Sequence, residues 1–118
     1  MPHASNPKTN DIIAALPECE WARLKDNLEL IELPLGKVLY ESGATLTHVY
    51  FPTTAIVSLL YVMEDGDSAE IAVVGSEGIV GIALFMGGES TPSRAVVQSA
   101  GWAFRLKSQL LKNEFNRS

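Results

Sequence analysis

The chain has 118 residues, enough for one domain with a core of its own, and hydrophobic residues make up 47% of it. Nine Lys and Arg stand against fourteen Asp and Glu, and the formal charge of -5 argues against binding of this chain itself to nucleic acid. A single cysteine, Cys19, excludes an internal disulfide and a self-contained iron–sulfur cluster, and the two histidines, His3 and His48, are too few for most histidine-based metal sites.

The N-terminus is polar and carries no basic region followed by an apolar run, so it does not resemble a signal peptide. We expect residues 1–9 to form a flexible leader before one domain over residues 10–118. The longest apolar stretch, residues 56–63, is too short to cross a bilayer. Together with the unpaired cysteine, these features predict a cytoplasmic protein without a membrane contact.

Short helices are expected at both ends of this domain. Asn10 or Thr9 can cap the first helix, and Pro17 suits the first position of the second. The apolar periodicity predicts helices over residues 11–16, 18–27 and 107–115.

Between the helices, short runs of β-branched, aromatic and aliphatic residues alternate with Gly, Pro and Asp. The expected strands cover residues 28–33, 38–40, 48–51, 55–63, 68–74, 95–97 and 102–106. Asp65 and Gly66 predict a hairpin turn, and Gly101 is expected to separate the last two strands. This pattern is typical of a mainly β, antiparallel sandwich or barrel.

The segment over residues 75–88 holds five of the nine glycines. Gly78 and Gly81 bracket a small apolar turn that is expected to open a short helix at Ile82. Such a turn exposes backbone N–H groups and can cradle an anion, or it can be a packed corner where two backbones approach closely. Arg94, just before a strand, is either a phosphate partner or a solvated residue at a strand edge.

Five stretches of the chain together resemble a known family. They read LGKVLYESG at 35–43, VYF at 49–51, DG at 65–66, GSEGIVG at 75–81 and RAVV at 94–97. In this order they are similar to the cyclic-nucleotide-binding domain of Crp/Fnr-type bacterial transcription regulators. The resemblance implies an antiparallel β jelly roll with flanking helices, in which the glycine turn, a short helix and the next strand bind the phosphate.

On this resemblance, the candidate ligand-binding residues lie in two groups, Gly78, Ile79, Val80 and Gly81, and Ser93, Arg94 and Ala95. Two positions depart from the pattern of members that bind cyclic AMP. Ile79 stands where those members have an acidic residue for the ribose hydroxyl. Arg94 follows Ser93 instead of preceding a small hydroxyl residue, and a shift by one place on a strand turns a side chain to the other face.

Other candidate sites have simpler explanations. Asp65 and Asp67 flank a hairpin glycine, are too few for an EF-hand calcium loop, and are expected to be solvated. His48 has no second histidine nearby to complete a metal site. Since no nucleophile with a base and no paired carboxylates can be named, an enzyme is the least favoured function.

The leading hypothesis is therefore the effector-sensing domain of a transcription regulator, with a cyclic nucleotide as the possible effector. We expect the natural polypeptide to continue into a dimerisation helix and a DNA-binding domain, and to form a homodimer. The alternative is a degenerate form of the fold that binds no nucleotide and acts as a protein-interaction or dimerisation scaffold.

Overall fold

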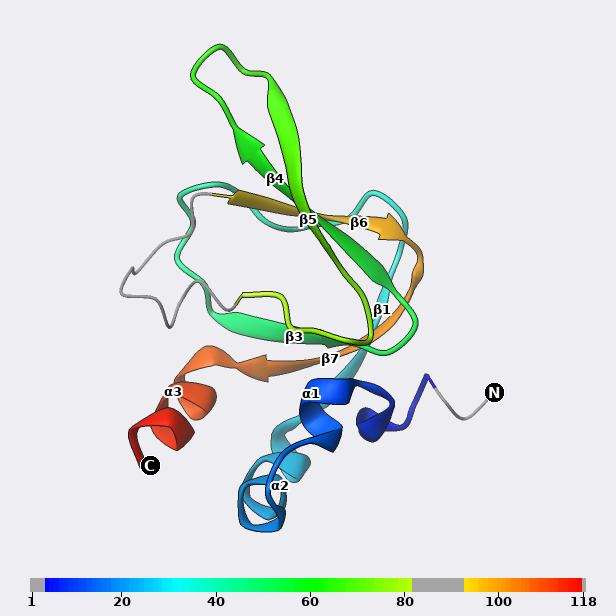
Figure 1. Cartoon of the computed structure of the whole chain (residues 1–118), viewed down its shortest axis with the longest axis vertical. Coiled ribbons are helices and arrows are strands. Elements are labelled where there is room, and N and C mark those ends of the chain that lie inside the picture. The colour runs from blue at the N-terminus through cyan, green and yellow to red at the C-terminus, as the bar shows by residue number, and fades with distance from the viewer. Residues whose placement is uncertain (1–3, 82–92, 118) are drawn as a thin grey trace.

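The computed structural model describes residues 4–81 and 93–117, and two antiparallel sheets pack face to face in it (Figure 1). The three-stranded sheet has the order β1 (Glu29–Leu33), β7 (Gly101–Lys107), β3 (His48–Pro52). The four-stranded sheet has the order β2 (Val38–Tyr40), β6 (Ser93–Ser99), β4 (Ile56–Val62), β5 (Ser68–Val74). The expected strands are all present, and a mainly β antiparallel domain is confirmed.

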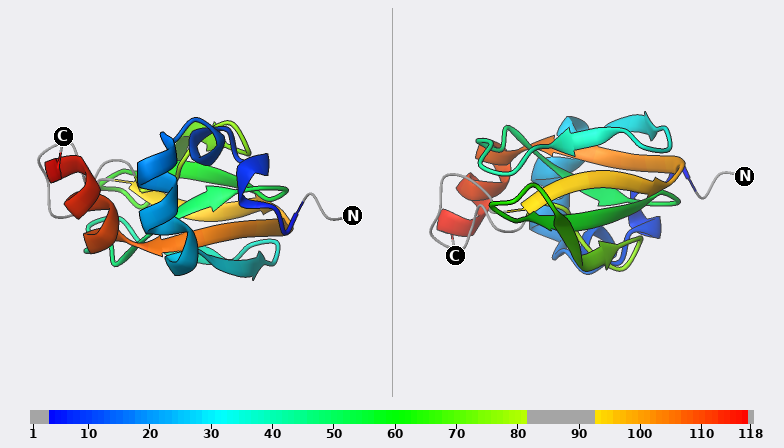
Figure 2. Two further views of the ribbon diagram at one scale, coloured as in Figure 1. Left: turned by 90° about the horizontal axis from the view of Figure 1, so that it is seen from below. Right: turned by 90° about the horizontal axis from the view of Figure 1, so that it is seen from above.

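The helices lie on one side of the molecule, against the three-stranded sheet, and no described helix covers the outer face of the other sheet (Figure 2). They are η1 (Pro7–Thr9), α1 (Asp11–Ala14), α2 (Glu18–Leu24), η2 (Lys25–Asn27) and α3 (Ser108–Arg117). Of the two expected caps, Asn10 is the one that caps α1. Pro17 is the N-cap of α2 and not its first helical residue, so its expected position was wrong by one place. The predicted helix over residues 18–27 is in fact α2 followed by the 3-10 turn η2.

The described part of the predicted leader contacts the domain. Asn6 caps the short helix η1 by accepting a hydrogen bond from the Lys8 backbone N–H. The Lys8 ammonium lies 4.8 Å from the centroid of the Trp21 ring, and the Thr53 hydroxyl donates to the Ala4 carbonyl. The boundary between leader and domain at residue 10 stays a prediction.

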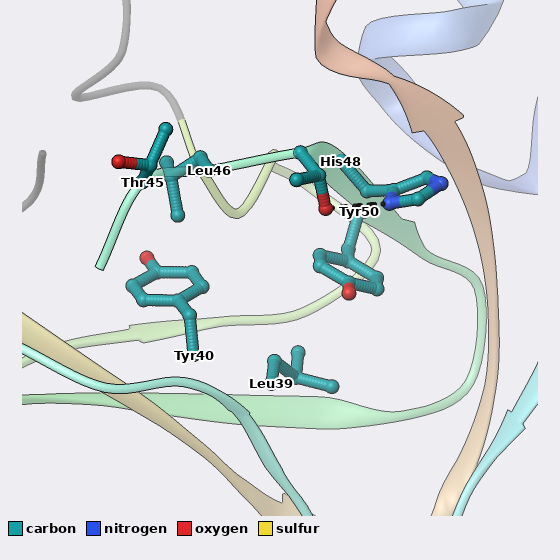
Figure 3. Close-up of a pocket in the computed structure, with 7 residues that line it drawn as sticks. Leu39, Tyr40, Thr45, Leu46, His48 and Tyr50 are labelled. Carbon is teal, nitrogen blue, oxygen red and sulfur yellow. Dashed lines mark hydrogen bonds between the residues drawn. The ribbon is translucent and has the colours of Figure 1, made fainter. Parts of the chain in front are cut away.

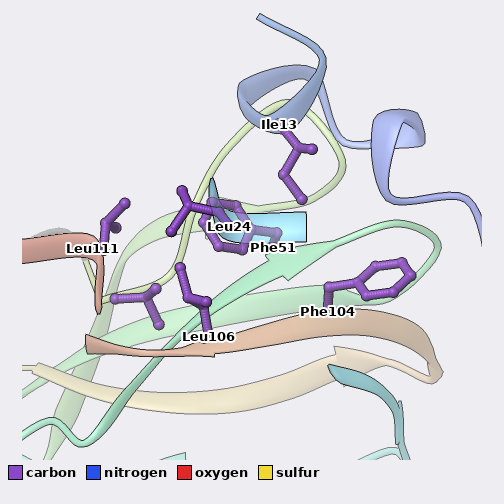
Figure 4. Close-up of a cluster of buried hydrophobic side chains, with 7 residues drawn as sticks. Ile13, Leu24, Phe51, Phe104, Leu106 and Leu111 are labelled. Atoms are coloured by element: carbon purple, nitrogen blue, oxygen red, sulfur yellow. The ribbon is translucent and has the colours of Figure 1, made fainter. Parts of the chain in front are cut away.

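Two separate apolar cores form because β3 and β7 of the three-stranded sheet bury side chains on both faces. The helix-side core consists of Ile13, Leu24, Val49, Phe51, Phe104, Leu106 and Leu111 (Figure 4). The inter-sheet core consists of Leu33, Ala55, Val57, Val80, Ala95, Val97 and Ala103. Successive side chains of a strand point to opposite faces, so β7 sends Ala103 to one core and Phe104 to the other.

The β4–β5 hairpin has the turn that its sequence predicts. Gly66 adopts a φ of +91°, which favours glycine, and the Met63 N–H donates to the Asp67 carbonyl across the turn. The Asp65 carboxylate accepts from the Asp67 N–H, and both aspartates are exposed. They act as turn residues, as expected.

Gly101 does not separate the last two strands, because it is the first residue of β7 and Ala100 alone connects β6 to β7. The reason for a glycine is a close approach of backbones. The Trp102 carbonyl accepts hydrogen bonds from the N–H groups of Thr53, Thr54 and Ala55. A methyl group on Gly101 would lie 2.5 Å from the backbone nitrogen of Ala55.

We predict that Gly101→Ala lowers the free energy of unfolding by about 2–4 kcal/mol, because backbone atoms at this distance cannot yield without breaking the three hydrogen bonds. Urea unfolding followed by tryptophan fluorescence measures the loss. Gly75→Ala is the matched control, since the nearest atom there is the carboxylate oxygen of the exposed Glu77 side chain. Equal stabilities of the two variants would contradict the close approach.

Candidate functional site

The segment over residues 75–81, called the glycine turn below, runs beside β3. The Tyr50 N–H donates to the Val80 carbonyl at 2.9 Å, and the Val80 N–H donates back to the Tyr50 carbonyl at 2.8 Å. At the start of the turn, the Gly75 N–H donates to the Glu77 carboxylate, and such backbone hydrogen bonds lower the pKa of Glu77. Hydrogen bonds therefore join the end of the turn to the three-stranded sheet, and a hydrogen bond within the turn holds its beginning.

Asn10 ties the glycine turn to the helices. Its fully buried amide group donates to the carbonyls of Pro52 and Gly78, each at 2.8 Å. Its side-chain oxygen accepts from the N–H groups of Ile12 and Ile13, which caps α1. One side chain thus joins α1, the end of β3 and the glycine turn.

The side chains of the turn alternate between the two cores. Val80 is fully buried in the inter-sheet core, whereas Ile79 packs against the helix-side core. Gly81 has a φ of +109°, and a methyl group on it would lie 3.1 Å from Val49 Cγ1. A side chain at Gly81 would therefore be strained, and the turn can lie close to β3 only because of this glycine.

On β6, the second group of candidate residues also alternates. Ser93 and Ala95 are buried on the face of Val97, which belongs to the inter-sheet core. Arg94 lies on the opposite, outer face, where its Nε atom is 2.9 Å from Glu41 Oε1. This contact is an ion pair without hydrogen-bond geometry, since the Arg94 Nε is buried and has no hydrogen-bond partner among the described residues.

The structure therefore brings some of the candidate residues together and separates others. Val80 and Ala95 meet in the inter-sheet core, and Ser93 shares the face of Ala95. Ile79 and Arg94 lie outside that core. The short helix expected at Ile82 falls outside the described residues.

A small cavity of about 50 Å³ lies at the start of β3 (Figure 3). It is lined by Leu39, Tyr40, Thr45, Leu46, Thr47, His48 and Tyr50. The Tyr40 and Tyr50 rings both lie against the cavity, and burial raises the pKa of the Tyr50 hydroxyl. A volume of this size holds one or two water molecules, whereas small-molecule sites occupy roughly 300–1,000 Å³.

Sequence reasoning did not propose these two tyrosines. Both pack against the inter-sheet core, and Tyr50 also pairs with Val80 of the glycine turn. The signal in the sequence was the VYF stretch of β3, whose alternation sends Tyr50 to one face and Val49 and Phe51 to the other.

Charged groups gather beside this cavity. Arg105 pairs with Glu29 across β7 and β1, with 3.2 Å between Arg105 Nε and Glu29 Oε1. Partial burial lowers the pKa of the His48 imidazole, and nearby Arg105 and Lys107 lower it further, whereas Glu29 raises it. The Thr47 hydroxyl lies 3.0 Å from His48 Nδ1.

Beside these groups, a wider hollow of about 450 Å³ is bordered by Asp26, Asn27, Glu29, Lys107 and Leu110. Its charged lining residues carry both signs, which does not favour one class of ligand.

Within the described ranges, no three His, Cys, Asp or Glu side chains are grouped to bind a metal ion. No helix among these residues is long and apolar enough to span a membrane.

Comparison with known proteins identifies the fold and a family. A family model for the cyclic nucleotide-binding domain matches residues 30–118. No curated protein sequence matches the chain.

Three solved structures illustrate the fold. The sensor domain of the transcriptional regulator DNR from Pseudomonas aeruginosa has a TM-score of 0.77 at 14% identity, over 92% of this chain and 73% of that one. The N-terminal domain of a Streptomyces coelicolor transcriptional regulator has a TM-score of 0.70 at 24% identity, over 98% and 80%. A mutant regulatory subunit of a cAMP-independent protein kinase A from Trypanosoma brucei, bound to cAMP in the A site, has a TM-score of 0.75 at 18% identity, over 86% and 37%. The expected jelly roll is confirmed, and this chain spans little more than a third of the kinase subunit.

We predict that His48 titrates below the usual histidine pKa of about 6.5. The unfolded chain then binds more protons than the folded one just below that pH, so the free energy of unfolding falls as the pH drops through about 6.5. NMR titration of the imidazole measures the pKa, with His48→Gln to assign the signal. The slope of stability with pH should be smaller in the variant, and a His48 pKa at or above 6.5 would contradict the prediction.

Proposed function

Because the chain belongs to the cyclic nucleotide-binding domain family, we propose that it is the effector-sensing domain of a Crp/Fnr-type transcription regulator. The effector binds between the two sheets, at the end where the glycine turn, Ser93 and the two cavity tyrosines lie. This role is regulatory and not enzymatic. A regulator of transcription works on DNA, which puts the protein in the cytoplasm.

The observation that carries the proposal is the inward alternation of the glycine turn and β6. Val80 and Ala95 are both buried in the inter-sheet core, so the glycine turn and β6 face the same interior. Ser93 adds a hydroxyl on the same face. Backbone N–H groups and a hydroxyl are suitable partners for the phosphate of a cyclic nucleotide.

We further propose how binding is passed on. The effector shifts the population between two positions of α3, which follows the last strand. In the longer polypeptide, α3 leads to the dimerisation helix and the DNA-binding domain of a homodimer. The acidic charge of this chain agrees with a separate domain for DNA.

The scaffold alternative has support of its own. Arg94 faces away from the inter-sheet core and pairs with Glu41, so it is not available as a phosphate partner in this arrangement. Ile79 cannot accept a hydrogen bond from a ribose, and it packs on the helix-side core. A domain with these features can keep the fold while its contacts with other protein chains carry the function.

Calorimetric titration with cyclic mononucleotides and cyclic dinucleotides separates the two proposals. For sensing, we expect saturable binding that Ser93→Ala weakens about five- to tenfold, because one hydrogen bond to a charged phosphate is lost. Arg94→Gln, at the next position of β6, is the matched control for Ser93→Ala. It should leave the affinity within about twofold, since its side chain points to the outer face.

The outcomes are distinct. Binding that disappears in Arg94→Gln would mean that this side chain turns inward and would overturn the proposed set of contacts. If no nucleotide produces binding heat in the titration, and the protein is shown to be folded by its cooperative unfolding, the result would favour the scaffold proposal.

A further inference from the structure

We propose that the inter-sheet face of the three-stranded sheet carries a binding site for an oxyanion, the phosphate or carboxylate group of a small molecule. Three side chains, Arg105, Lys107 and His48, form it and are called the oxyanion site below. They belong to β7 and to the start of β3, whereas the candidate residues described above belong to the glycine turn and β6. The inference deepens the proposed function, since it assigns the acidic group of the effector to the sheet opposite β6.

The alternation of β7 places both cations on one face. Ala103 is buried in the inter-sheet core, whereas Phe104 and Leu106 are buried in the helix-side core. Successive side chains of a strand point to opposite faces, so Arg105 and Lys107 share the face of Ala103.

The neighbouring strand β3 completes the group. His48 lies directly opposite Lys107, and Tyr50 lies directly opposite Arg105. Tyr50 packs against the inter-sheet core, which places this side of β3 on the same face. Side chains that lie opposite one another on antiparallel strands have Cβ atoms about 4.5–5.5 Å apart, so the four side chains form one cluster.

The local electrostatic potential at His48 is positive, although the formal charge of the chain is -5. Partial burial is the largest cause that lowers the pKa of His48. Arg105 lowers it further by more than Glu29 raises it, and Lys107 adds to the effect of Arg105. Asp26 borders the hollow beside Lys107 but is not among the charges that shift the pKa of His48, so it does not neutralise the site.

The donors of the site are only partly used. Arg105 Nε lies 3.2 Å from Glu29 Oε1, and Lys107 is exposed and forms no ion pair with a described residue. The Thr47 hydroxyl lies 3.0 Å from His48 Nδ1 (Figure 3). When this hydroxyl donates to Nδ1, the proton of the neutral ring is on Nε2 and can be donated to an anion. A guanidinium, an ammonium and an imidazole can thus donate to one oxyanion.

Strand β6 supplies no positive charge to the space between the sheets. Its buried side chains are Ser93, Ala95 and Val97, and Arg94 points to the outer face. An acidic group in this space therefore has its countercharge on β7 and not on β6. A single oxyanion also needs far less room than a nucleotide, which agrees with the small cavity that His48 lines.

NMR titration at constant ionic strength tests the site, with the His48 ring and the backbone amides as probes. The titrants are inorganic phosphate and succinate, each compared with sodium chloride. We expect saturable shifts at residues 47–50 and 105–107 and a rise in the pKa of His48, because a bound anion favours the imidazolium. The titrant that binds more tightly identifies the group as a phosphate or a carboxylate. Absence of saturable shifts with both would overturn the proposal.

Three variants separate the site from general ion binding. Arg105→Gln should weaken binding about tenfold, because a charge-assisted hydrogen bond is lost. Arg94→Gln is the matched control and should leave the affinity within about twofold, since both arginine side chains are 37% exposed and both pair with a glutamate. Glu29→Gln should strengthen binding about two- to fivefold, because it removes the carboxylate that competes for Arg105. A purely structural role of Arg105 would not produce this gain.

Lys107→Gln changes an exposed residue and should weaken binding about three- to fivefold, so it tests the site even if Arg105→Gln impairs folding. Equal losses in Arg105→Gln and Arg94→Gln, or weaker binding in Glu29→Gln, would overturn the proposal. Oxyanion binding without any nucleotide binding would contradict the nucleotide as effector and leave this site standing. Nucleotide binding that Arg105→Gln does not change, without oxyanion binding, would contradict this site alone.

Discussion

The side chain of Asn10 is the interaction on which the rest of the arrangement depends. Its two N–H groups and its oxygen are used completely, by two carbonyls of the sheet side and two N–H groups of α1. A buried amide is costly unless every polar atom has a partner, so this side chain tolerates only one relative position of α1, β3 and the glycine turn. The helical layer is therefore placed by directed hydrogen bonds, and its apolar contacts alone would allow it to slide.

The three-stranded sheet provides the second constraint, because it separates two cores. β3 and β7 present apolar side chains on both faces, and the glycine turn beside β3 follows the same rule. Ile79 and Val80 consequently belong to different cores although they are neighbours in sequence. An effector that displaces Val80 would move Ile79 as well, and through it the packing under α1 and α2. This geometry makes the helical layer sensitive to the interior of the jelly roll.

Much of this fold could be predicted from local sequence. The strands follow from alternation and turn residues, and the sequence offers Asn10 or Thr9 as the first cap because capping is a contact within one helical turn. The other contacts of Asn10, with Pro52 and Gly78, join segments far apart in the chain and leave no periodic signal. The ion pair between Arg23 of α2 and Glu114 of α3 likewise leaves no local signal in the sequence. The sequence predicts only that Gly101 separates two strands, because the close approach of the Ala55 backbone cannot be inferred from the neighbours of Gly101 in sequence.

The candidate site shows where a family motif and a structure give different information. The motif identifies Ile79 and Arg94 by their positions in the sequence. The role of a residue on a strand also depends on the face to which its side chain points, and a shift by one residue changes that face. Both side chains point away from the inter-sheet core, and the candidate residues that face it, Val80, Ser93 and Ala95, are small or carry a hydroxyl. Among the described residues, the cavity at this end is far smaller than a nucleotide. Binding there would therefore require the glycine turn and β6 to separate, and the free energy of that separation would set both the affinity and the size of the signal that reaches α3.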